Sequence, residues 1–122
     1  MAKFYQEFVT KIAGTSFENR IGKIWNVQKN IKAGNDVSIF LRRERTNEYD
    51  ANAIAVIAKT GTTYAKLGYI PAKEAEWLAP RMDAGLSTFV KESTVIGSKR
   101  YITMRLTVAY EVVPAFEYEY ER

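Results

Sequence analysis

The spacing of apolar residues predicts β-strands over most of this chain. Apolar and polar positions alternate between Phe4 and Ala13, and the same period of two recurs further along the sequence. Turn-forming residues separate the segments, with Thr60-Gly61-Thr62 and Gly97-Ser98 typical of hairpins. Gly68, inside one segment, indicates a bulge or a close backbone approach. The pattern predicts six strands, at residues 4–13, 36–43, 53–59, 64–70, 86–96 and 99–113.

Two segments instead have apolar residues at helical spacing. Asn19 is a candidate N-cap for the first, which Gly34 ends, and Pro71 suits the first turn of the second, which Gly85 ends. Pro80 lacks a backbone donor, so it is expected to kink or split the second helix. The positions at helical spacing are Ile21, Ile24, Trp25, Gln28 and Ile31 in the first helix, and Ala75, Leu78, Ala79 and Met82 in the second. Trp25 and Trp77 are expected to anchor these helices to the core.

Six strands with two short helices favour a mainly β fold in one domain. The tight turns predict a small barrel or a strongly coiled sheet, and there are too few helices for parallel crossovers. An α+β sandwich with both helices on one face remains the alternative. The 122 residues, 47% of them hydrophobic, are enough to bury a core, so residues 1–122 are expected to form a single domain.

The composition removes several classes of chemistry. The chain has no cysteine, which excludes disulfides and thiolate metal sites, and no histidine, the commonest general base and metal ligand. No segment is apolar enough to be a signal peptide or to span a bilayer. A soluble, cytoplasmic protein without cofactor, metal or catalytic activity is therefore expected.

The net charge of +4 is unevenly distributed. Residues 1–110 carry 17 Lys and Arg against 10 Asp and Glu, whereas residues 111–122 carry four acids and one base. The acidic end, assigned to 114–122, is expected to be a last strand or a frayed terminus. A basic body favours a polyanionic partner such as nucleic acid.

The segment from Arg43 to Val56, RERTNEYDANAIAV, predicts a polar loop immediately before an apolar strand. Asn47, Asp50 and Asn52 can bond nearby backbone groups and so hold a tight loop without glycine. Tyr49 and Asp50 then place an aromatic ring beside a carboxylate at the start of a strand. Ordered loops on a rigid sheet are common positions for binding residues.

This loop motif, together with Leu67-Gly68-Tyr69-Ile70-Pro71, resembles the HIRAN family, a small module found in some helicase-like DNA translocases and alone in bacteria and phages. The likeness is strongest over residues 8–85 and includes Phe8 to Gly14, followed by Phe17 and Arg20. Arg45 and Glu48 stand where the family usually has prolines, and Ser16 stands where its DNA-binding member has a basic residue.

The resemblance implies a six-stranded, OB-like barrel with two short α-helices that captures the 3′ end of single-stranded DNA. In this chain Tyr49 would stack on the terminal base, Asp50 would accept the 3′-hydroxyl, and Asn47 would shape the pocket. Phe17 would meet the second base. With Tyr69 lining the groove and basic residues meeting phosphates, the predicted binding set is Phe17, Arg20, Asn47, Tyr49, Asp50, Tyr69, Lys99 and Arg100.

Other interpretations of these residues stay open. Asp50 and Asn52 can simply satisfy loop backbone groups, Tyr49 can be a packing residue, and Arg43 and Glu44 can form a surface ion pair. Carboxylates could also hold Mg²⁺ for a nuclease. A third hypothesis is a protein-interaction module that contacts a DNA repair or replication protein. The sequence leaves the oligomeric state open.

Overall fold

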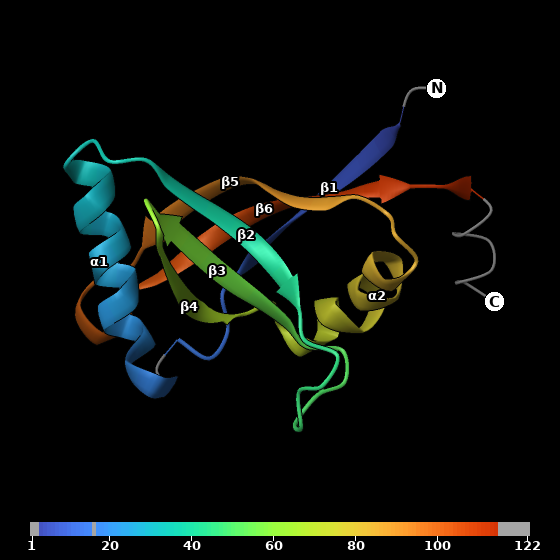
Figure 1. Cartoon of the computed structure of the whole chain (residues 1–122), viewed down its shortest axis with the longest axis horizontal. Helices are drawn as coiled ribbons and strands as arrows, with labels where there is room; N and C mark the ends of the chain where they lie inside the picture. The colour runs from blue at the N-terminus through green and yellow to red at the C-terminus, as the bar shows by residue number, and fades with distance from the viewer. Residues whose placement is uncertain (1–2, 16, 115–122) are drawn as a thin grey trace.

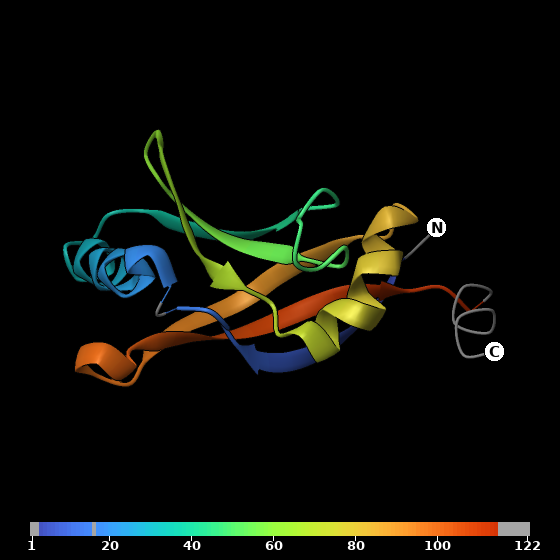
Figure 2. The same cartoon turned by 90° about the horizontal axis from the view of Figure 1, so that it is seen from below.

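The computed structural model describes residues 3–15 and 17–114 and contains two three-stranded antiparallel sheets. Figures 1 and 2 show these sheets as two crossed layers, with the helices at opposite ends. One sheet has the order β1-β6-β5, formed by Phe4–Lys11, Thr103–Val112 and Thr88–Ile96. The other has the order β2-β3-β4, formed by Val37–Arg43, Ile54–Thr60 and Thr63–Tyr69.

An isolated β-bridge joins the two sheets between Ala13, two residues after the end of β1, and Tyr69, the last residue of β4. The Ala13 N–H donates to the Tyr69 carbonyl at 2.8 Å, and the Tyr69 N–H donates to the Ala13 carbonyl at 2.9 Å. Gly68 permits this approach, because a Cβ there would lie 2.3 Å from the Ala13 oxygen. The pairing of β3 with β4 also shifts register at this point, so the predicted bulge and close approach are both confirmed.

The predicted six-stranded, OB-like, mainly β fold with two helices is confirmed. Its six strands form two sheets linked by the Ala13 bridge, and pairing around a closed barrel is not seen within the described residues. The helices do not share one face, so the sandwich alternative is wrong (Figure 1). None of the helices in residues 3–15 and 17–114 is long and apolar enough to cross a bilayer.

The first helix, α1 (Arg20–Lys32), follows a single 3-10 turn, η1 (Phe17–Asn19). Asn19 occupies the N-cap position with φ 64°, but its side chain makes no capping hydrogen bond to a described residue. Ile24 and Val27 are buried, whereas Trp25 is 42% exposed. The prediction that Trp25 anchors the helix to the core is therefore wrong.

The second helix, α2 (Ala72–Asp83), begins directly after Pro71 and continues through Pro80. Pro80 therefore does not split the helix. Pro80 lies three residues before the C-terminal residue of α2. Few backbone hydrogen bonds of the helix follow it, so its effect on the helix is small. Trp77 packs against the core as predicted, with its ring 5.0 Å from the ring of Phe8.

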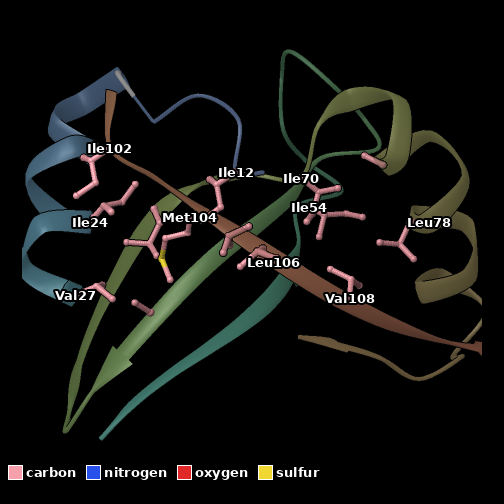
Figure 3. Close-up of a cluster of buried hydrophobic side chains, with 14 of the residues drawn as sticks. Ile12, Ile24, Val27, Ile54, Ile70, Leu78, Ile102, Met104, Leu106 and Val108 are labelled. Atoms are coloured by element: carbon pink, nitrogen blue, oxygen red, sulfur yellow. The ribbon is translucent and has the colours of Figure 1, made fainter. Parts of the chain in front are cut away.

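The hydrophobic core fills the space between the two sheets and continues beneath both helices. Figure 3 shows Ile24 and Ile102 at the α1 end, Met104 and Leu106 in the middle, and Leu78 at the α2 end. All of these side chains are at most 1% exposed. Burial of a Leu or Ile side chain contributes roughly 1.5–3 kcal/mol, so this continuous core holds the loops at a fixed separation.

The connection between β5 and β6 is longer than predicted. Ile96 pairs with Thr103, and the intervening residues include a 3-10 turn, η2 (Lys99–Tyr101). Lys99 and Arg100 therefore lie in a turn and not at the start of a strand. Gly97 has φ 81° and passes close to the Tyr101 carbonyl, where a Cβ would lie 2.4 Å from the oxygen, so the turn folds back on itself.

Most of the predicted acidic end lies outside the described residues, as does Ser16.

Candidate nucleic-acid interface

A groove of about 760 Å³ lies between the loop after β2, the segment leading into α1, and the end of β4. Its walls come from three regions that are distant in sequence. Gly14 and Phe17 precede α1 and Arg20 is its first residue, whereas Lys66 and Tyr69 come from β4. The loop contributes Glu44, Asn47, Glu48, Tyr49 and Asp50. The bridge between Ala13 and Tyr69 forms the boundary between the first two regions.

Asn47 organises the loop from within. Its side-chain oxygen accepts hydrogen bonds from the backbone N–H groups of Tyr49, at 2.9 Å, and Asp50, at 3.0 Å. Its side-chain nitrogen donates to Glu44 Oε1 at 3.1 Å. Asn can bond its own loop backbone in this way without help from glycine. The sequence prediction that Asn47 shapes the loop is confirmed by these contacts.

A polar network of Glu44, Lys66 and Tyr69 forms the floor of the groove. The Tyr69 hydroxyl donates to Glu44 Oε1 at 2.8 Å and accepts from Lys66 Nζ at 3.0 Å. Lys66 Nζ also lies 2.6 Å from Glu44 Oε2. The Glu44 side chain is only 17% exposed, so this network ties the loop to β4 away from most of the solvent.

The pKa of Glu44 reflects this network. Burial alone would raise the pKa, but hydrogen bonds from Lys66, Tyr69 and Asn47 outweigh it and lower the pKa to about 2. The hydrogen bond to Glu44 in turn raises the pKa of Lys66. Glu44 is therefore a charged, compensated group at neutral pH.

Arg20 supports the wall that carries Phe17. Its guanidinium lies 5.2 Å from the ring centres of both Phe17 and Tyr69, and it donates to the Gly14 carbonyl at 3.0 Å. Cation–π contacts of this kind are stronger when the cation is removed from water, and Arg20 is only 5% exposed. Arg20 is thus a buried support for the aromatic wall.

A second set of ion pairs fixes the outer part of the loop to α2. Arg43 forms a bidentate ion pair with Asp83, in which Nε donates to Oδ1 at 3.0 Å and Nη2 donates to Oδ2 at 3.1 Å. Arg43 also donates to the Ala53 carbonyl. Arg45 Nε donates to the same carboxylate at 3.1 Å. Burial would raise the pKa of Asp83, but its hydrogen bonds and charge contacts with Arg43 and Arg45 lower it. Arg45 therefore supplies a contact between this loop and α2.

Two aromatic residues of the groove are widely exposed. Tyr49 is 89% exposed and Phe17 is 59% exposed, whereas Tyr69 is half-buried. An ordered aromatic ring that is left in solvent gains little stability from burial. Tyr49 is therefore presented by the loop and is not the packing residue that one alternative describes.

Asp50 lines the same groove as these exposed rings and is hydrogen-bonded to the loop backbone. One of its carboxylate oxygens accepts from the Asn52 N–H at 2.8 Å. Among the described residues no donor reaches the other oxygen, and the residue is only partly exposed. Asp50 therefore has the backbone role that its type predicts, and it also lines the groove with a carboxylate that has one further acceptor oxygen.

The structure brings together six of the eight predicted site residues: Phe17, Arg20, Asn47, Tyr49, Asp50 and Tyr69 line one groove. Lys99 and Arg100 do not line it. They lie in η2, beside α1, where the Lys99 carbonyl accepts from Trp25 Nε1 at 3.3 Å.

Sequence reasoning missed the part that Glu44 plays. It paired Glu44 with Arg43, whereas the structure pairs Glu44 with Lys66 and Arg43 with Asp83. Arg43 is the last residue of β2 and Glu44 is the first residue after it, and the two side chains contact different partners. The available signal was the single acid at position 44 among the arginines at 42, 43 and 45.

The groove carries carboxylates, which are ligands for hard cations. No group of three or more Asp or Glu residues in the described part of the chain could hold a metal ion, and Glu44 is already occupied by Lys66.

Comparison with solved structures supports the fold. A crystal structure of a protein from Lactobacillus plantarum matches with a TM-score of 0.59 and 20% identity, covering 91% of this chain and 100% of that one. The crystal structure of the HIRAN domain of human HLTF matches with a TM-score of 0.57 and 17% identity, covering 93% of this chain and 82% of that one. A search of curated proteins found no match.

A match between the amino-acid sequence and the model of a protein family identifies the family of this chain. The HIRAN domain model matches residues 5–113, which extends beyond the region of strongest resemblance at 8–85 and includes β5 and β6. The chain therefore belongs to the HIRAN family, whose domains are known as nucleic-acid-binding modules.

Proposed function

We propose that this domain binds single-stranded DNA at a free 3′-hydroxyl end. The observation that supports this most is that two exposed aromatic residues, Tyr49 and Phe17, line the same groove as the carboxylate residue Asp50. Tyr49 stacks on the terminal base and Phe17 on the next. Asp50 accepts a hydrogen bond from the 3′-hydroxyl, and Asn47 holds the loop in the shape that this requires.

The charges in the groove favour an end over an internal nucleotide. The groove is lined by two cations, Arg20 and Lys66, and three carboxylates, Glu44, Glu48 and Asp50. Lys66 compensates Glu44, which leaves two acids facing the ligand. A phosphodiester beside Asp50 would be repelled, whereas a hydroxyl is a hydrogen-bond donor. A strand terminus offers that hydroxyl.

The domain acts as a binding module without catalysis of its own. Stacking and hydrogen bonding need no proton transfer, and the sequence has no histidine or cysteine for such a step. A motor or nuclease that uses the bound end is supplied by a partner, for which a DNA repair or replication protein is the candidate.

Fluorescence anisotropy tests the ligand and the end preference together. Short 5′-labelled oligonucleotides are compared with 3′-hydroxyl and 3′-phosphate ends. A hydrogen bond to a charged group contributes roughly 1.5–3 kcal/mol, so the hydroxyl end should bind roughly 10- to 100-fold more tightly. Affinity should also fall with added salt as counterions are released.

Other results would point to the alternatives. Equal affinity for both ends would contradict end recognition. Cleavage of the oligonucleotide on addition of Mg²⁺ would support a nuclease, and the absence of any binding would leave a protein-interaction module as the better description.

A further inference from the structure

We infer that the strand leaving the groove is bound by a second surface, formed by one face of α1 and by η2. This inference rests on the proposed function, because it concerns the nucleotides on the 5′ side of the captured end. We call this surface the α1–η2 patch. It consists of Trp25, Lys29, Lys32, Lys99, Arg100 and Tyr101.

The patch has the two components that single-strand binding requires. Trp25 is 42% exposed and Tyr101 is 75% exposed, so two flat rings are available for stacking. Lys29 and Lys32 lie four and seven residues after Trp25, which places all three on the same helix face. The Arg100 guanidinium lies 5.8 Å from the Tyr101 ring centre.

Local contacts join the helix face and the turn into one surface. Trp25 Nε1 donates to the Lys99 carbonyl at 3.3 Å, so the indole holds η2 against α1. Lys99 has φ 53°, which is uncommon for a residue other than glycine. A backbone conformation of this kind persists only where the surrounding structure holds it. In this turn the next two residues, Arg100 and Tyr101, are exposed to solvent.

The charge of the patch complements the charge of the groove. Neither α1 nor η2 contains an acidic residue, and the patch carries four basic side chains. The groove, in contrast, has more carboxylates than cations. Phosphates of a strand whose end lies in the groove therefore find their counter-charges outside it, and this basic surface supplies them.

The patch begins close to the groove. Arg20, in the groove wall, is the first residue of α1, and Trp25 lies five residues later, or about 7.5 Å along the helix axis. On the other side, the Ile12 N–H donates to the Met104 carbonyl, and Thr103 Oγ1 donates to the Ile12 carbonyl. These bonds hold the residues after η2 beside Ala13, which lines the groove.

The test compares oligonucleotides of two lengths, both with a 3′-hydroxyl. One has about four nucleotides, enough for the groove, and the other has about twelve, within the range covered by a single OB-type domain. Binding is measured for the wild type, for Lys99→Gln/Arg100→Gln, and for Tyr101→Ala. Lys59→Gln/Arg105→Gln is the matched control, because it removes the same charges from exposed positions in β3 and β6.

The wild type should bind the longer oligonucleotide more tightly than the shorter one. Lys99→Gln/Arg100→Gln should weaken binding of the longer one by roughly fivefold or more and lower its salt dependence by about 1.4 in the log–log slope, as expected for two lost phosphate contacts. Tyr101→Ala should weaken it by at least about fivefold. Binding of the shorter oligonucleotide should change little, and the control should match the wild type.

The inference is overturned if affinity does not rise with length, or if the patch variants and the control behave alike. Failure of the proposed function is a separate result, since it requires the wild type to ignore the 3′-hydroxyl on the shorter oligonucleotide. Selective capture of an acidic protein by the patch, with no effect of the variants on DNA, would also overturn the inference.

Discussion

The side-chain oxygen of Asn47 accepts a hydrogen bond from the backbone N–H of Asp50 at 3.0 Å. This bond, with the one from the Tyr49 N–H, sets the loop conformation from which both side chains project. The loop is thus positioned by one amide group that also donates to Glu44. A change at Asn47 should therefore affect both stability and binding.

Asn47→Ala should lower the free energy of unfolding by roughly 1–3 kcal/mol, because it leaves loop N–H groups without their acceptor. It should also weaken 3′-end binding, which urea denaturation and anisotropy measure separately. Asn52→Ala is the control in the same loop, since the Asn52 side chain makes no hydrogen bond in the described part of the chain. Equal effects of the two substitutions would contradict the role assigned to Asn47.

Glu44 should make stability dependent on pH in the acid range. Its folded pKa of about 2 lies below its ordinary value of 4.5, so the charged form stabilises the fold above pH 4.5, and this contribution is lost as the pH falls toward 2. At neutral pH, Glu44→Gln should lower the free energy of unfolding by roughly 1–3 kcal/mol. The difference from the wild type should shrink between pH 4.5 and pH 2.

Urea denaturation at several pH values measures this difference. Glu92→Gln is the control, because Glu92 is an exposed carboxylate on β5, outside the network. A difference for Glu44→Gln that stays constant across this pH range would show that the network does not depend on the charge.

Tyr49→Ala should weaken binding without a large change in stability. Stacking on an aromatic ring contributes roughly 1–3 kcal/mol per base, so affinity should fall by roughly 5- to 100-fold. The ring is 89% exposed, so thermal denaturation should change little. Tyr49→Phe should retain most of the affinity, and Tyr64→Ala, at an exposed tyrosine of β4, should behave as the wild type in binding.

Gly68→Ala should destabilise the fold through the bridge between the sheets. The added Cβ would lie 2.3 Å from the Ala13 carbonyl oxygen and 2.5 Å from Ile12 Cγ2, so the backbone of one strand must move. Overpacking of this kind costs about 1–3 kcal/mol. Gly22→Ala, in α1 with no atom within 4 Å of the new Cβ, should instead stabilise by about 0.5–1 kcal/mol. Calorimetric melting of both variants should show opposite shifts.

The sequence predicted the parts of the fold that depend on local periodicity. Strands with a buried face, such as β3, and the stop signals at Gly34 and Gly85 were identified because apolar spacing and turn residues act over a few positions. Trp25 was assigned to the core because its spacing matched Ile21 and Ile24. Its position at the side of the helix depends on η2, which lies more than 70 residues away.

The candidate site was predictable where one loop supplies it. Asn47, Tyr49 and Asp50 are close in sequence, and their residue types already indicate a turn that presents side chains. The partners of Glu44 were not predictable, because Lys66 and Tyr69 reach it only through the pairing of β3 with β4. The separation of Lys99 and Arg100 from the groove likewise depends on the turn at Gly97.

The affinity of Asp50→Ala for oligonucleotides with 3′-hydroxyl and 3′-phosphate ends tests end recognition most directly. The acceptor oxygen of Asp50 should account for the preference of the wild type, so the variant should lose roughly 10-fold or more on the hydroxyl end and bind the phosphate end as well as before or better. The ratio of the two affinities should fall to about 1. Equal losses on both ends, with the ratio unchanged, would contradict the role of Asp50 as the acceptor of the 3′-hydroxyl.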